Sequence, residues 1–292
     1  MHKFRVVTTS GLFHADEVFA IATLAILHGD APDLIRTRKQ NYVQAAILDD
    51  TTYVVGVGGN YNPNLLNFDF NKNTSSFSLV WKEYGSAIVS RFSIPDQLNA
   101  EITNAIKTIL VDYIEAINLG KCRKTRTDIV EVIEQLNKCW YESEDSEDQS
   151  SRMLQAVAIA LTYITRLIAN TLGIIMAIDL IDHAERLDDG KIIILDKDIP
   201  WEEYVSGADD SALFVILPGP SGNTNVYAIP VDATNTKFRM LFPEKWRTKI
   251  NRDEVTGIEG CVFILSDGSI AGNRSKEGAI EMARKAIKLA SS

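Results

Sequence analysis

His14 and Asp16 lie two residues apart in SGLFHADEVFA, directly after an apolar segment, FRVVTT, and directly before a helical pattern, EVFAIATLAIL. An imidazole and a carboxylate at a strand-to-helix turn are common ligands of a divalent metal. The same residues suit a helix start, because Asp16 and Glu17 would face the positive end of the helix dipole. A hard divalent ion needs several more donors than two. A metal loop and a helix start with a hydrogen-bonded histidine are therefore both open interpretations.

Two further segments carry polar residues in patterns that suit a ligand. Asp69 in NFDFNKNTSS ends a predicted strand and enters a polar loop, where a turn-forming role is favoured. Near the C-terminus, SDGSIAGNRSKEGA joins a glycine-containing loop to a helix start, a combination that binds anions through backbone N–H groups. Arg274 could add a bidentate phosphate contact. The alternative is a plain turn with Asn273 or Ser275 as the helix N-cap.

The elements that position these residues follow from hydropathy patterns. In the first half, strand patterns at 4–9, 34–38, 53–59 and 65–70 alternate with helical ones, which predicts a parallel sheet with helices on both faces. Ligands of such sheets gather at the carboxyl ends of the strands. His14, Asp69 and the glycines of YVVGVGGN all follow predicted strands. That glycine run lacks the G-x-G-x-x-G spacing of a dinucleotide fingerprint.

The second half predicts a smaller α+β domain. Helical patterns occupy most of 78–140, and the acidic, serine-rich 141–151 is expected to be an exposed loop. The apolar 153–181 is expected to form a buried core helix, broken near Gly173, rather than a membrane span, because polar residues interrupt it. Strand patterns follow at 191–195, 212–219, 225–230 and 261–265, with a hairpin connection at 218–223 and a final helix at 275–290. The predicted organisation is an α/β domain at 1–140, a connecting loop and helix at 141–190, and a C-terminal lobe at 191–292, with a cleft between the lobes.

The composition limits the class of protein. The 292 residues are 46% hydrophobic and 24% charged, which is an ordinary balance for a globular protein. A net charge of −9 argues against a surface that coats nucleic acid broadly, although a small basic groove for a short oligonucleotide is compatible with it. Three dispersed cysteines predict no disulfide framework and a cytoplasmic or other reducing compartment. The N-terminus has no signal-peptide pattern.

Taken in order along the chain, several segments resemble the melanocyte-proliferating-gene exonuclease family of the DHH (Asp-His-His) phosphoesterase superfamily. The resemblance runs almost end to end, and is clearest in SGLFHADEVFA, LIRTR, VVGVGGNYNP, YGSAI, KDIPWEEYV and the closing block from PEKWR to GNRSKEGA. It implies a DHH-type parallel-sheet domain with a helical extension and a smaller α+β substrate lobe. It also implies phosphodiester cleavage of RNA or short oligonucleotides by water activated between two Mn²⁺ or Mg²⁺ ions.

Carried over residue by residue, the resemblance leaves a depleted metal site. His14, Asp16 and Asp69 fall on family ligand positions. Four other ligand positions carry residues that supply no charge: Thr9, Gly56, Phe70 and Asn118. Two cations held close together repel strongly without bridging carboxylates, so tight binding of two ions is not expected. We therefore expect no metal cofactor, or a weakly bound Mn²⁺ or Mg²⁺.

Three hypotheses follow from this resemblance. The first is a catalytically impaired phosphoesterase that keeps a nucleotide or phosphate site; the residues expected to line it are Gly58, Gly59, Gly272, Asn273, Arg274 and Ser275. The second is an active phosphodiesterase with a rearranged site around His14, Asp16 and Asp69. The third is a structural or assembly subunit. Short RNA or nucleotides, a second copy of the chain or a protein partner are the expected partners, with no membrane.

Overall fold

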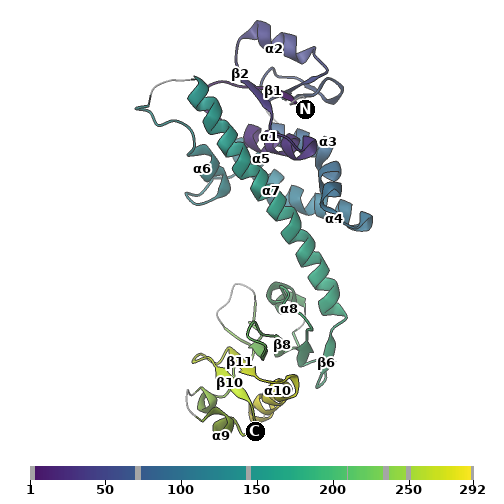
Figure 1. The fold of residues 1–292 in the computed structure, drawn as a ribbon, viewed down its shortest axis with the longest axis vertical. Coiled ribbons are helices and arrows are strands. Elements are labelled where there is room, and N and C mark those ends of the chain that lie inside the picture. The colour runs from purple at the N-terminus through teal and green to yellow at the C-terminus, as the bar shows by residue number, and fades with distance from the viewer. Residues whose placement is uncertain are drawn as a thin grey trace. The chain divides into compact units, whose positions relative to one another are not determined.

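The computed structural model describes residues 4–69, 74–142, 146–208, 210–232, 237–247 and 251–290. The chain divides into two compact units, Met1–Leu172 and Gly173–Ser292. The mixed α/β architecture expected from the sequence is confirmed, with one sheet in each unit (Figure 1). The DHH-type arrangement and the three-part division of the chain stay predictions.

The first unit is built on a mainly parallel sheet of five strands in the order β2-β1-β3-β5-β4. The strands are β1 (Arg5–Thr8), β2 (Asp33–Arg36), β3 (Thr52–Val55), β4 (Tyr61–Asn62) and β5 (Asn67–Phe68). Strands β1, β2, β3 and β5 run parallel, and β4 is antiparallel to β5. The two-residue β4 was not predicted, because so short a strand leaves no periodic pattern.

Helices cover both faces of this sheet (Figure 1). Helix α2 (Gln40–Ile47) places Val43, Ala46 and Ile47 against Val7 and Val54. Helix α1 (Ala15–His28) has every residue from Ala15 to Ala25 buried, so it is the core helix of the unit. It ends at Gly29, which adopts a left-handed φ of 69° and returns its N–H to the carbonyl of Ala25.

A helical extension follows the sheet, as the pattern at 78–140 predicted. It comprises α3 (Ser76–Val89), α4 (Asp96–Ile106), a π-helical turn at Lys107–Val111, α5 (Asp112–Asn118) and α6 (Ile129–Glu134). A short 3₁₀ turn at Pro63–Leu65 joins β4 to β5, and another at Ser90–Phe92 joins α3 to α4.

Helix α7 (Ser146–Asp182) runs from the first unit into the second. It begins inside the segment predicted to be a loop, because serine and acidic residues there suit a helix N-terminus. It also continues through Gly173, where a break was expected, since a single glycine costs a long helix only about 1 kcal/mol. Its part Asp148–Asp182 is long and apolar enough to cross a membrane, with 28% of the most apolar window buried in the protein.

The second unit is a six-stranded sheet in the order β10-β11-β9-β8-β7-β6. The strands are β6 (Glu185–Leu187), β7 (Ile192–Ile194), β8 (Phe214–Pro218), β9 (Thr224–Ala228), β10 (Cys261–Ile264) and β11 (Ile270–Asn273). All neighbours are antiparallel except β7 and β8. The hairpin predicted at 218–223 joins β8 to β9.

Alternating side chains divide the core of the second unit between two helices. Ile192, Ile194, Phe214 and Ile216 face α10 (Lys276–Ala290), which contributes Ala279, Met282, Ala283 and Ala286. The intervening residues of the same strands, Ile193 and Val215, pack with Trp201 and Val205 of the α8 (Glu202–Ala208) region. A short 3₁₀ turn (Glu244–Trp246) and α9 (Arg252–Thr256) complete the unit.

Candidate functional site

The predicted ligand positions of the first unit meet at one edge of its sheet. Strands β1, β3 and β5 are parallel neighbours, and they end at Thr8, Val55 and Phe68. Thr9, Gly56 and Asp69 follow these ends directly. The edge also includes the switch in strand order beside β1, where ligands of such sheets bind.

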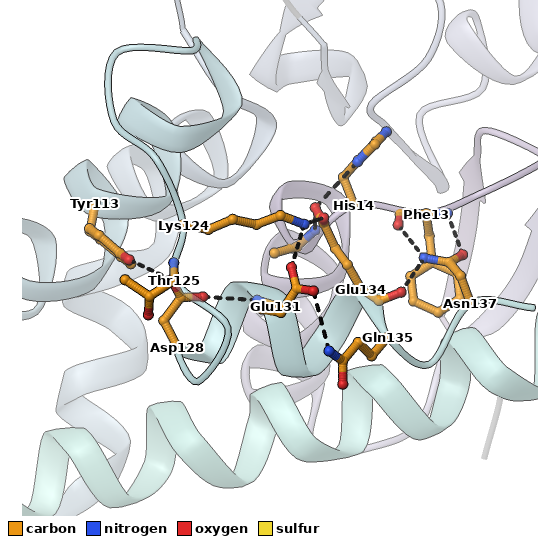
Figure 2. A network of polar contacts seen from close by, with 11 residues as sticks. Phe13, His14, Tyr113, Lys124, Thr125, Asp128, Glu131, Glu134, Gln135 and Asn137 are labelled. Atoms are coloured by element: carbon orange, nitrogen blue, oxygen red, sulfur yellow. Dashed lines mark hydrogen bonds and ion pairs between the residues drawn. The ribbon is translucent and has the colours of Figure 1, made fainter. Parts of the chain in front are cut away.

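His14 directly precedes α1 and contacts Glu134, which is 120 residues away along the chain (Figure 2). Its Nδ1 lies 3.3 Å from Oε1 of Glu134, at the end of α6. This hydrogen bond, with the negative charges of Glu17, Glu134 and Asp16, raises the pKa of His14 against the effect of burial. Lys124 forms ion pairs with both Glu134 and Glu131. The predicted metal histidine is therefore part of a charge network within the protein.

Asn137 fixes the loop that carries His14 (Figure 2). Its side-chain oxygen accepts a hydrogen bond from the N–H of Phe13, and its nitrogen donates to the carbonyl of Phe13, both at 2.8 Å. Phe13 is fully buried. The segment around α6 thus holds the loop on both sides of the Phe13 peptide.

Asp16 is buried and holds the N-terminus of α3. Its two carboxylate oxygens accept hydrogen bonds from the N–H groups of Ser76 and Phe77, each at 2.9 Å. The neighbouring N–H groups are also paired, because Ser75 donates to Glu115 and Ser78 donates to the Ser75 hydroxyl. All four consecutive N–H groups at this helix end therefore have a side-chain acceptor. Burial raises the pKa of Asp16, and the hydrogen bonds from Phe77, Ser75 and Ser76 oppose that shift.

Glu17 is a buried acid that the sequence pattern does not distinguish as a ligand. Its side chain is 5% exposed, and its Oε1 has no hydrogen-bond partner within the described part of the chain. Burial, followed by the charge of Asp16, raises the pKa of Glu17 to about 7. The Thr8 hydroxyl, also buried, is likewise unpartnered among the described residues. The signal in the sequence is the position of Glu17 beside Asp16, which by itself predicts only a favourable interaction with the helix dipole.

Asp69 closes the glycine loop that follows β3. Its Oδ2 accepts a 2.7 Å hydrogen bond from the N–H of Gly59. Gly56, Gly58 and Gly59 all have a positive φ, and a Cβ on Gly58 would lie 2.7 Å from Ile47 Cδ1. Glycine at position 58 therefore lets the loop pack on α2, and the phosphate-binding role predicted for Gly58 and Gly59 stays a prediction.

The four positions expected to have lost metal ligands are placed as follows. The Thr9 hydroxyl accepts a 2.8 Å hydrogen bond from Arg38 Nε. A Cβ on Gly56 would lie 3.4 Å from Glu17 Cβ, so a side chain at this position would contact Glu17. Asn118 ends α5, one turn beyond Glu115, which reaches the N-terminus of α3. Phe70 lies outside the described residues.

This donor set does not fit the two-metal centre that the resemblance implies. His14 contacts Glu134, Asp16 contacts α3 and Asp69 contacts Gly59. Across the residues that the structure describes, no group of three or more histidine, cysteine or acidic side chains is placed to hold a metal ion. The positions that should supply a bridging carboxylate and an imidazole carry Gly56 and Thr9.

Two of the four predicted phosphate residues of the second unit lie on a strand rather than in a loop. Gly272 and Asn273 belong to β11, which the sequence pattern did not predict. The Asn273 side chain is fully buried; its oxygen accepts from the N–H of Ser275, and its nitrogen donates to the carbonyl of Glu259. Ser275 accepts from the N–H of Gly278 and so caps α10, the alternative that the sequence left open.

Glycines make room for this buried asparagine. A Cβ on Gly278 would lie 2.3 Å from Asn273 Oδ1, and a Cβ on Gly272 would lie 2.4 Å from Phe263 Cε1. Neither glycine can gain a side chain without displacing its neighbour. The Asn273 side chain is accordingly occupied in packing, whereas Arg274 is exposed. A ligand role for Gly272, Asn273, Arg274 and Ser275 stays a prediction.

Comparison with known proteins identifies the family. The MYG1 exonuclease family model, described as an uncharacterised protein family (UPF0160), matches residues 5–287. The chain therefore belongs to this family, as the sequence resemblance predicted.

Relatives match over nearly the whole chain. The MYG1 protein of Dictyostelium discoideum is 26% identical over 98% of this chain and 97% of its own length. The human MYG1 exonuclease is 25% identical over 97% of this chain and 85% of its own length. Among solved structures, a pGpG-specific phosphodiesterase, PggH, from Vibrio cholerae covers 99% of both chains at 13% identity, with a TM-score of 0.30. A likeness at that score carries no argument here.

Proposed function

We propose that this chain is a DHH-type member of the MYG1 exonuclease family that binds phosphate esters of nucleotides or short RNA but has lost two-metal hydrolysis. The family membership and the exonuclease names of its mouse and human relatives support the phosphoesterase and nucleic-acid part of the proposal. The contacts of His14, Asp16 and Asp69 support the loss of hydrolysis.

The observation that carries the proposal is that each surviving ligand position has a protein partner. Two N–H groups occupy the oxygens of Asp16, and the N–H of Gly59 occupies Oδ2 of Asp69. His14 is paired with Glu134, whose pKa is lowered because the hydrogen bonds from His14 and Lys124 outweigh burial. A metal ion at Asp16 would have to displace both N–H partners. His14 and Asp69 are each paired through one atom only, and the chain supplies too few further donors for a two-metal centre.

Metal binding is the most direct test. Protein dialysed against EDTA would be titrated with Mn²⁺ by calorimetry, in parallel with a cleavage assay on short RNA. We expect dissociation constants weaker than about 10⁻⁴ M, the weak end of oxygen-ligand cation sites in proteins, and no metal-dependent cleavage. Tight, near-stoichiometric binding of Mn²⁺ with RNA cleavage abolished by His14→Ala would overturn the proposal and favour an active, rearranged site.

A restored variant tests the residue assignment. Thr9→His, Gly56→Asp, Phe70→His and Asn118→Asp introduced together return an imidazole or carboxylate to each depleted position. We expect Mn²⁺ affinity to rise, and His14→Ala in the same background to reduce it again. Because Gly56 has a φ of 66°, circular dichroism must first show that this variant is folded. A folded variant that binds no more Mn²⁺ than the unaltered chain would show that these positions are misassigned.

A further inference from the structure

Two arginines at the carboxyl end of β2 contact the loop that follows β1. Arg36 ends β2 and Arg38 follows two residues later, and both reach across to the loop after β1. Arg36 Nη2 donates to the carbonyl of Gly11, and Arg38 Nε donates to the Thr9 hydroxyl at 2.8 Å. Both guanidinium groups are therefore held against the segment Thr9–Leu12, which we call the β1 loop.

The positive charges of Arg36 and Arg38 are not neutralised by an ion pair within the described residues. The pKa of Arg36 is lowered, first by burial and then by the positive charge of Arg38, while Glu17 opposes both effects. Neither arginine forms an ion pair with a carboxylate in the described part of the chain, and the Nε of Arg36 is buried with no acceptor there. The Arg36 guanidinium also lies over the Phe13 ring, 5.6 Å from its centroid. Two guanidinium groups that contact the same loop and keep unused donors favour an anion beside them.

The β1 loop also carries backbone donors that have no partner within the part of the chain that the structure describes. The N–H groups of Ser10, Gly11 and Leu12 donate to no protein acceptor among the described residues. Gly11 has a φ of 94°, and the nearest atom to a Cβ built there would be Arg38 Nη2, at 3.9 Å. Successive free N–H groups in a turn with a left-handed residue are a recurrent way to bind phosphate.

We infer that Arg36, Arg38 and the β1 loop form a binding site for a phosphate group carrying two negative charges, such as inorganic phosphate or the phosphomonoester of a nucleotide. Two guanidinium groups match a dianion in charge, and their planar donor faces match its oxygens in geometry. Thr9 orients Arg38 at a position where the family resemblance implies a metal-binding imidazole. At the carboxyl ends of β1 and β2, the protein therefore has hydrogen-bond donors for an anion where the family resemblance implies a ligand for a metal cation.

The inference rests on the proposed function only for the class of ligand, a phosphate ester. It concerns binding and needs neither a metal nor hydrolysis, so its test is run in EDTA. A protein that cleaved RNA with Mn²⁺ but also bound phosphate at these arginines would overturn the proposed function and keep this site.

The test is a calorimetric titration with inorganic phosphate at low ionic strength. We expect one site in the unaltered chain, and a loss of affinity of about tenfold or more in Arg36→Met and in Arg38→Met, as expected when one charge-assisted contact is removed. Arg91→Met is the matched control, because Arg91 also donates to a backbone carbonyl, that of Leu27 in the last turn of α1. Its affinity should stay within about twofold of the unaltered chain.

A second measurement avoids dependence on folded variants. Phenylglyoxal modification of the unaltered protein, mapped by mass spectrometry, should be slowed at Arg38 by phosphate but not by chloride at equal ionic strength. AMP should compete with phosphate, and adenosine should not. Absence of a phosphate site in the unaltered chain, unchanged affinity in a folded Arg38→Met variant, or equal labelling of Arg38 with and without phosphate would each overturn the inference.

Discussion

At the scale of single residues, adjacent carboxylates in one motif have different surroundings. Asp16 and Glu17 follow one another in HADE and are both nearly fully buried. Asp16 accepts two hydrogen bonds from the start of α3, whereas Oε1 of Glu17 accepts none from the described residues. Removing the Asp16 side chain therefore leaves two buried N–H groups without an acceptor. Removing Oε1 of Glu17 leaves no described donor unpaired.

We expect Asp16→Ala to lower the free energy of unfolding by about 2–4 kcal/mol, because each unpaired buried N–H group costs roughly 1–3 kcal/mol. Asp16→Asn keeps one acceptor oxygen and should lose less. Glu17→Gln is the matched control, since it removes a buried charge and keeps the shape of the side chain; it should cost less than Asp16→Ala. Urea denaturation in EDTA measures all three, and an unaltered midpoint for Asp16→Ala would show that Asp16 does not stabilise α3.

The sequence allowed only part of this site to be predicted. Local spacing brought His14 and Asp16 to notice, because a strand end and a helix start leave clear patterns. Glu134 and Asn137 contact His14 and Phe13 from more than 100 residues away along the chain. Nothing local distinguishes them from other polar residues of a surface helix. Which polar groups pair across such a separation depends on how the elements pack. That packing cannot be predicted from the local patterns of a single sequence.

At the scale of elements, the sequence predicts long periodic helices and strands but not short ones. Helix α1 and the apolar strands β1, β3 and β8 follow from periodicity, since burial requires it. Strands β4, β6 and β11 have two to four residues and polar or small side chains, so they leave no such pattern. The missing pattern of β11 leaves two interpretations of Asn273 open in the sequence, an anion-binding loop and a helix cap, and the structure buries its amide against the start of α10.

The C-terminal end of α1 carries a histidine whose ionisation opposes folding. The ring of His28 stacks on Phe4 at 4.4 Å, and its Nε2 lies 3.0 Å from the Tyr53 hydroxyl. Burial, and then the charge of Arg91, lowers the pKa of His28 below its ordinary value of 6.5. Below pH 6.5 the unfolded chain therefore binds a proton that the folded chain resists, and stability is lost as the pH falls toward the folded pKa.

We expect the free energy of unfolding of the unaltered chain, relative to His28→Phe, to decrease between pH 7.5 and pH 5.5. The comparison is needed because the raised pKa values of His14 and His183 act in the opposite direction over this range. Phenylalanine keeps the stacking partner of Phe4 and removes the titrating group. Denaturation curves at four or five pH values measure the difference, and a difference that stayed constant with pH would show that His28 does not titrate differently on folding.

At the scale of the whole molecule, α7 is the element whose composition and packing point in different directions. Its length and apolar composition satisfy the requirements of a membrane span. Within the first unit, however, one face is buried in the protein: Met153, Ala156, Val157, Ala160, Ile164 and Ile168 are each no more than 4% exposed. The other face exposes apolar residues such as Leu154 and Ile159, but also the polar Gln155, Arg166 and Asn170. A lone span is apolar on every side, so these polar residues and the buried face together favour a packed helix.

We therefore expect the protein to stay in the aqueous phase. In Triton X-114 partitioning it should remain with the aqueous fraction, and it should not sediment with neutral phosphatidylcholine vesicles. The matched variant is Ala160→Asp, which places a charge on the buried face: a packed helix should make this variant less stable to urea by several kcal/mol, because an unpaired buried charge is strongly destabilising. A lipid-facing helix would instead leave stability unaltered and bring the unaltered chain into the detergent phase, and that pair of results would contradict the packing of α7 described here.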